Sequence, residues 1–140
     1  TGDIITPNAQ KKQIHLQISD EDIVLMSYPI ETVLAEKIET ILSRAELSTR
    51  MKDYYDIYSI LIKDKDNLII EDLKKAIQNT FIHRNSQSIF DNTSEILNQI
   101  KKSETLKERW ETYKNDNLYV GQVTFYEVSV QVKELIILGF

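Results

Sequence analysis

Glycine and proline are scarce in this sequence, and that scarcity is the strongest constraint on its fold. The chain of 140 residues contains three glycines and two prolines. Both residue types destabilise helix interiors, so a chain that nearly lacks them favours helices. Hydrophobic residues make up 41% of the chain, which is enough for a core, and the length corresponds to about one domain. We therefore expect one compact, mainly helical domain.

Apolar residues recur at helical spacing through most of the chain. Between residues 31 and 45, the positions Val33, Leu34, Ile38, Ile41 and Leu42 predict an amphipathic helix. A second helix is predicted over residues 50–62, where tyrosines contribute to a broad apolar stripe. Further helices are expected at residues 70–83, 93–101, 103–115 and 121–138.

Two segments show alternating patterns that are typical of strands. Ile14, Leu16 and Ile18 alternate with polar neighbours, and residues 23–26 form a short apolar run, so two short strands are predicted within residues 12–28. Residues 121–138 fit both a strand and a helix, and we predict a helix there. The expected fold class is α+β, mainly α: a bundle of about five to six helices with a short β element at the N-terminus.

The composition excludes several classes of protein. Charged residues make up 28% of the chain and the mean hydropathy is -0.33, so we expect no membrane partner. The net charge of -5 argues against nucleic-acid binding through overall charge, but it leaves room for a local basic face. The absence of cysteine fits the reducing cytoplasm, where we expect the protein. His15 and His83 are far apart in sequence, and we interpret both as structural.

Charged residues on the first two predicted helices form a candidate site. Lys37 and Arg44 lie about 20° apart on a helical wheel, on one flank of the apolar stripe. Asp53 and Asp56 are one turn apart near the start of the second helix. If the two helices form an antiparallel hairpin, the bases of the first approach the acids of the second.

This cluster has two interpretations. Lysine and arginine hold nucleotide phosphates and offset charge that develops in phosphoryl transfer, while a carboxylate orients the lysine or binds a nucleophile or metal. Charges beside an apolar stripe also form ordinary surface pairs, and aspartate near a helix start is favoured by the helix dipole alone. The spacing by itself leaves both interpretations open, and the structural one is the more common.

Other features are weaker candidates for a binding site. Trp110 and Tyr113 are spaced i, i+3, which suits a base-stacking platform but more often marks a core. No GxGxxG, Walker A or GxSxG sequence is present. Basic residues on the later helices would contact phosphate if they shared one face, but acids are interspersed among them: Lys74, Lys75, Arg84, Lys101, Lys102, Lys107 and Arg109.

Two sequence blocks resemble a known family. Residues 28–37 read Tyr-Pro-Ile-Glu-Thr-Val-Leu-Ala-Glu-Lys, and residues 50–58 read Arg-Met-Lys-Asp-Tyr-Tyr-Asp-Ile-Tyr, with Arg44 between them. In order and spacing these elements resemble the AbiEii/AbiGii nucleotidyltransferase toxin family. Gly2-Asp3-(x)3-Pro7 resembles the segment just before them, and residues 76–84 resemble the Thr-Phe-(x)2-Arg stretch that follows. The resemblance is strongest in the first half of the chain.

The resemblance implies a polymerase-β-like nucleotidyltransferase. In such enzymes an N-terminal α/β palm carries a Gly-Ser phosphate loop and an Asp-x-Asp pair that binds Mg2+, and a helical C-terminal region closes the cleft. Some members transfer a nucleotide from an NTP to the 3′ end of tRNA and halt translation. They are paired with an antitoxin in toxin–antitoxin and phage-defence systems.

The resemblance also assigns roles to residues by their position. Lys37 matches the family's nucleotide-contacting lysine and is expected to be catalytic as well, and Asp53 matches a catalytic acid. Arg50, Asp56 and Arg44 match the pattern as nucleotide-binding residues. For Arg44, a structural ion pair with Asp53 or Asp56 is the alternative.

The Gly-Ser loop and the Asp-x-Asp pair do not occur at their expected place. Asp20-Glu21-Asp22 has the spacing, but it follows the Gly-Asp-(x)3-Pro segment, so we interpret it as a turn. We expect residues 1–140 to be a single-domain fragment of a larger protein. Residues 1–29 would be the end of the palm-like β region, and residues 30–140 the C-terminal helical region. The Mg2+ ligands would then lie in the missing N-terminal half, and this fragment would hold no cofactor and be inactive.

Two other functions stay open. The chain is alternatively a non-enzymatic helical module that binds an antitoxin or another partner through an exposed apolar stripe, such as residues 135–138, Leu-Ile-Ile-Leu. It is also compatible with a relative that has lost activity and kept only the fold.

Overall fold

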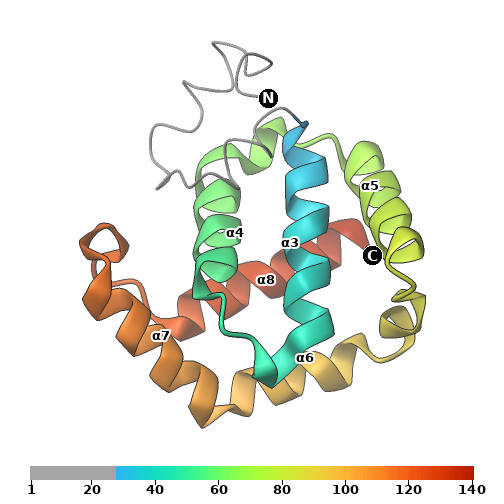
Figure 1. The fold of residues 1–140 in the computed structure, drawn as a ribbon. Coiled ribbons are helices and arrows are strands. Elements are labelled where there is room, and N and C mark those ends of the chain that lie inside the picture. Colours follow the sequence, from blue (N-terminus) through green and yellow to red (C-terminus); the bar gives the residue numbers. More distant parts are fainter. Residues whose placement is uncertain (1–27) are drawn as a thin grey trace.

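The structure, a computed structural model, describes residues 28–140, and the regular elements in that range are all helices (Figure 1). The predicted bundle of five to six helices is confirmed, and the described residues contain no strand. The helices are α3 (Ile30–Arg44), α4 (Met51–Asp64), α5 (Ile70–His83), α6 (Thr93–Lys102), α7 (Glu104–Asp116) and α8 (Phe125–Gly139).

Some sequence predictions fall outside the described residues. The β element predicted within residues 12–28 lies there, apart from Tyr28, as do His15 and the turn predicted at residues 20–22. The sequence predicts a mainly α fold, and the secondary structure of residues 28–140 consists entirely of helices. None of the helices in residues 28–140 is long and apolar enough to cross a membrane.

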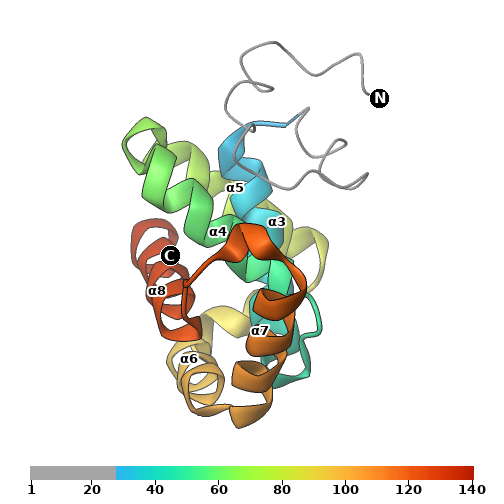
Figure 2. The same cartoon turned by 90° about the vertical axis from the view of Figure 1, so that its left-hand side faces the viewer.

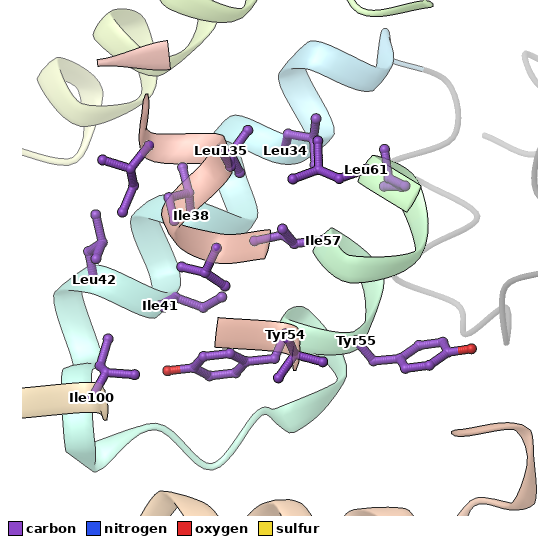
Figure 3. Packing of buried hydrophobic residues seen from close by; sticks show 14 of the residues in the cluster. Leu34, Ile38, Ile41, Leu42, Tyr54, Tyr55, Ile57, Leu61, Ile100 and Leu135 are labelled. Atoms are coloured by element: carbon purple, nitrogen blue, oxygen red, sulfur yellow. The ribbon is translucent and has the colours of Figure 1, made fainter. Parts of the chain in front are cut away.

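The core lies where α3, α4, α5 and α8 meet. Helix α3 packs against α5 and α4, and α8 packs against α4 and α5. Figure 3 shows Leu34 and Ile38 of α3, Ile57 of α4 and Leu135 of α8 gathered in one apolar cluster, and all four are fully buried. The i, i+4 spacing of Leu34 and Ile38 places both on the inner face of α3, which is the pattern that predicted this helix.

Helix α7 closes the bundle through an aromatic anchor. Trp110 is buried, and its indole Nε1 donates a hydrogen bond of 3.0 Å to the carbonyl oxygen of Val123. Helix α7 contacts α8, and Figure 2 shows α7 in the lower part of the molecule. Trp110 is therefore part of the core, which confirms the core interpretation over the base-stacking one.

The segment predicted ambiguously as strand or helix is α8. Gly121 precedes it with a φ of 63°, a left-handed conformation that glycine adopts without steric cost. Thr124 and Glu127 then form a capping box, in which the Thr124 hydroxyl accepts from the Glu127 amide at 3.1 Å. The turn and the cap together fix the start of a helix, which the valine alternation alone did not indicate.

The apolar run at residues 135–138 is mostly core. Leu135 and Ile136 are buried, whereas Ile137 is 65% exposed. The prediction that this run forms an exposed apolar stripe is wrong. Successive residues of a helix point in different directions around its axis, and Leu135 and Ile136 of α8 point into the core.

Arg84 joins the end of α5 to α3. Its guanidinium donates to the carboxylates of Glu36 and Glu39, and to the Thr40 hydroxyl at 3.2 Å. At the other end of α5, the amide of Ile69 donates to the Glu31 carboxylate at 2.9 Å. Both ends of α5 are thus fixed to α3 by acids within residues 31–39.

Two members of the predicted basic surface are structural. Arg84 is bound by the acids of α3, as described above. Arg109 donates to the carbonyl oxygens of Glu46 and Ser48 at 2.9 and 2.8 Å. These two arginines hold helices and loops together, so they do not belong to a phosphate-contacting face.

Because α8 has a buried and an exposed side, shortening a side chain to alanine should change the free energy of unfolding much more on the buried side. Leu135→Ala should lower the free energy of unfolding by about 2–5 kcal/mol, because it leaves a cavity between α8 and α4. Ile137→Ala should change it by less than about 0.5 kcal/mol, since that side chain faces solvent. Urea denaturation followed by circular dichroism measures both, and equal losses would contradict the packing described here.

The environment of Glu39 predicts a pH dependence. Burial alone would raise the pKa of Glu39, but hydrogen bonds from Ser43, Arg84 and Ser86 and the charge of Arg84 outweigh it and hold this pKa below its ordinary value of 4.5. A carboxylate with a depressed pKa in the folded state stabilises the fold above its unfolded-state pKa, and this contribution is lost as the pH falls through the folded-state pKa.

Glu39→Gln should therefore be less stable than the parent protein near neutral pH, and the difference should shrink as the pH falls below about 4.5. Urea denaturation of both proteins over a series of pH values measures this difference. A difference that stays constant down to acid pH would contradict the proposed ion pairing.

Candidate functional site

The site is built on the hairpin formed by α3 and α4. Figure 1 shows the two helices side by side, joined by a loop that contains the short helix η2 (Ala45–Leu47). Arg109 of α7 fixes this loop through the carbonyl hydrogen bonds of Glu46 and Ser48. The loop determines which residues of α4 lie opposite Lys37.

Lys37 lies between two aspartates in the interior of the hairpin. Its Nζ is 3.2 Å from Asp53 Oδ1 and 3.0 Å from Asp56 Oδ2. All three residues are buried. Because Asp53 and Asp56 are one turn apart on α4, a single ammonium group on α3 reaches both carboxylates.

Two further cations complete what we name the Lys37 cluster: Lys37, Arg50, Lys52, Asp53 and Asp56. Lys52 Nζ lies 2.9 Å from Asp56 Oδ2, and Arg50 Nε lies 3.5 Å from Asp53 Oδ2. Side-chain exposure rises from 6% at Lys37 to 22% at Lys52 and 40% at Arg50. The cluster therefore has a buried base at Lys37 and a more accessible rim at Lys52 and Arg50.

The buried base of the cluster has an unused acceptor. Asp56 Oδ1 is buried and has no hydrogen-bond partner among the described residues, although Asp56 Oδ2 is bound by two lysines. Most buried polar atoms in proteins are paired, so this carboxylate oxygen is an exception among the described residues.

Tyrosines line one side of the cluster. The hydroxyls of Tyr113 and Tyr119 are hydrogen-bonded to each other, and the Tyr55 hydroxyl donates to the Tyr119 carbonyl oxygen at 3.4 Å. Burial, the hydrogen bond with Tyr119 and the negative charge of Asp56 raise the pKa of Tyr113 above its ordinary value. Burial and the charge of Asp53 likewise raise the pKa of Tyr54. Tyr54 and Tyr113 therefore stay neutral at physiological pH.

The cluster does not suit a divalent metal. Mg2+ prefers several oxygen ligands around a vacant centre. Lys37 occupies the position between Asp53 and Asp56, and Lys52 adds a second ammonium beside Asp56. Within residues 28–140, no group of three or more histidine, aspartate or glutamate side chains is placed to hold a metal. The residues present therefore do not fit Mg2+.

Arg44 lies apart from the cluster. It is exposed at the end of α3, two turns beyond Lys37, and no ion pair among residues 28–140 joins it to Asp53 or Asp56. The hairpin places Asp53 and Asp56 opposite Lys37, so in the described part of the chain Lys37 pairs with them and Arg44 does not. His83 is also exposed, at the end of α5.

Lys52 belongs to the site but received no role from the sequence. Its i, i+4 spacing to Asp56 was a visible signal, because residues four apart on a helix are neighbours. The contact between Arg84 and the acids of α3 was also missed. That contact joins residues more than 40 positions apart, and no local spacing indicates it.

The buried ion pairs predict a strong effect of removing Lys37. Lys37→Met should lower the free energy of unfolding by about 3–5 kcal/mol, because it leaves Asp53 and Asp56 buried without their shared cation. Lys65→Ala is the matched control, since it removes a lysine whose ion pair with Glu134 is exposed, and it should cost less than about 1 kcal/mol. Urea denaturation measures both. Equal small losses would show that Lys37 is not held as described.

Comparison with known proteins identifies the family of the chain. No curated protein and no solved structure matches the chain. The family model described as "Nucleotidyl transferase AbiEii toxin, Type IV TA system" matches residues 1–126, which include both helices of the Lys37 cluster and most of the chain. The chain therefore belongs to the AbiEii nucleotidyltransferase toxin family of type IV toxin–antitoxin systems.

Proposed function

We propose that this chain supplies the helical side of the active site of a nucleotidyltransferase toxin, which transfers a nucleotide from an NTP to the 3′ end of tRNA. Membership of the AbiEii family supports the reaction class. The observation that carries the residue assignment is the bridge from Lys37 Nζ to both Asp53 and Asp56.

The cluster is arranged for contact with phosphate groups. Arg50 and Lys52 form the accessible rim, and their side chains contact the phosphates of the NTP. Lys37 lies below them and stabilises negative charge that develops during transfer, while Asp53 and Asp56 hold its ammonium in place. Fixed charges of this kind lower a barrier because they need no reorganisation during the reaction. In this proposal the exposed Arg44 contributes only longer-range positive charge.

The remaining parts of the active site lie outside these 140 residues in this proposal. A Gly-Ser loop and an Asp-x-Asp pair with Mg2+ belong to the palm of the intact parent protein, and the present chain alone is inactive. The parent acts in the cytoplasm, where its cognate antitoxin restrains it and where it serves in phage defence.

The alternative of a purely protein-binding module has less support. It relied on an exposed apolar stripe at the end of α8, and the structure buries Leu135 and Ile136 of that stripe. The Lys37 cluster, by contrast, is a costly arrangement of buried charge that a binding module does not require.

The proposal is tested by nucleotide transfer from each labelled NTP to total tRNA by the intact parent protein with Mg2+. Asp53→Asn should lower transfer by about 100-fold or more, because Lys37 is then misplaced. Arg50→Ala should lower it with little change in the thermal midpoint, since the Arg50 side chain is largely exposed.

Leu135→Ala is the control for stability. It destabilises the core without contacting the cluster, so it should keep transfer activity at temperatures where it is folded. Full activity of folded Asp53→Asn and Arg50→Ala proteins would contradict the site assignment. Absence of labelling by the folded parent with every NTP would contradict transfer to tRNA.

A further inference from the structure

A groove runs along the surface between α6, α7 and α8, away from the Lys37 cluster. Two adjoining cavities of about 290 and 390 Å³ form it, and Lys101, Tyr126 and Ser129 line both. Figure 2 shows α6 below α8, with α7 alongside. We name this surface the α6–α8 groove.

The groove carries positive charge in an acidic chain. Lys101 and Lys133 line the first cavity, and Lys101 and Lys107 line the second, where Glu111 is the single acid among the described lining residues. Glu111 pairs with Lys114, and Lys107 pairs with Glu104 in an exposed contact of 3.3 Å. The described residues provide no ion-pair partner for Lys101 or Lys133. Local positive charge of this kind contrasts with the net charge of -5 and favours an anionic ligand.

An aromatic side chain, Tyr126, lines both cavities. Tyr126 is 69% exposed, although it lies in the first turn of α8 beside the buried Phe125. An exposed aromatic ring between cationic side chains is the arrangement on which single-stranded nucleic acids stack their bases. An acidic peptide would use the lysines but would have little use for the ring.

We propose that the α6–α8 groove binds a single-stranded RNA segment, with phosphates at Lys101, Lys107 and Lys133 and a base stacked on Tyr126. Two adjoining cavities that share one aromatic side chain fit successive nucleotides of a strand better than they fit one free nucleotide. This binding does not require the transfer reaction, and neither cavity is lined by a residue of the Lys37 cluster.

The test is a binding titration of the intact protein with a fluorescent single-stranded oligoribonucleotide of about ten nucleotides. The triple variant Lys101→Ala/Lys107→Ala/Lys133→Ala should bind at least about ten-fold more weakly, and the slope of log affinity against log salt should fall by about 2. Tyr126→Ala should weaken binding by about ten-fold, and Tyr126→Phe should restore it.

A matched triple variant separates the groove from general charge effects. Lys63→Ala/Lys74→Ala/Lys75→Ala removes the same charge from exposed lysines of α4 and α5 that do not line the groove, and its affinity should stay close to that of the parent. All of these substitutions are at exposed positions, so folding is expected to persist and is checked by circular dichroism. Equal losses in the two triple variants would overturn the proposal.

Two competitors distinguish other occupants. A polyglutamate peptide that displaces the RNA and binds the Tyr126→Ala protein equally well would assign the groove to an acidic protein segment. A mononucleotide that competes as strongly as the strand would assign it to a free nucleotide. Either result would overturn RNA binding, whereas poor competition by both would support it. Because the titration reads binding alone, its outcome is independent of the transfer assay.

Discussion

A lysine held between two aspartates in the interior of a helical hairpin governs the arrangement of the surrounding helices. Removing each ion from water costs several kcal/mol, and only close pairing offsets that cost. Lys37 contacts both Asp53 and Asp56, so a shift of α3 along α4 would leave buried charge without a partner. Apolar contacts alone tolerate small shifts far better. The ion pairs therefore select one register of the hairpin, and Arg109 reinforces it by fixing the connecting loop.

Helix α3 makes contacts through both its apolar and its charged residues, so the positions of both kinds of side chain are constrained by neighbouring helices. Leu34 and Ile38 face the core, Lys37 faces α4, and Glu36 and Glu39 face Arg84 at the end of α5. The charged residues of α3 named here thus divide into two groups. Those that meet Arg84 fix the bundle, whereas the lysine one residue beyond Glu36 points to the candidate site. The sequence of α3 therefore contains residues that hold the bundle together next to a residue of the candidate site.

Local spacing predicted the helices well because each has a strong internal signal. The i, i+4 repeat in α3 and the inward face of α4 follow from burial on one side, and the structure agrees. Spacing could also place Asp53 and Asp56 on one face. It could not decide between Lys37 and Arg44 as their partner, since both lie on the same flank of α3 and the loop geometry makes the choice. It could not indicate that Arg84 and Arg109 are structural either, because their acceptors lie on distant segments.

The gradient of exposure across the Lys37 cluster connects stability to chemistry. A fully exposed cluster would be screened by solvent and mobile, and a fully buried one would be inaccessible to any ligand. Here the 6% exposed Lys37 is fixed by two carboxylates, while Arg50 at 40% reaches solvent from the same carboxylate network. The buried members pay the desolvation cost during folding, and in the proposed function this orients the rim before an anion binds. Such preorganisation is the form in which a folded chain best stabilises charge that develops in a reaction.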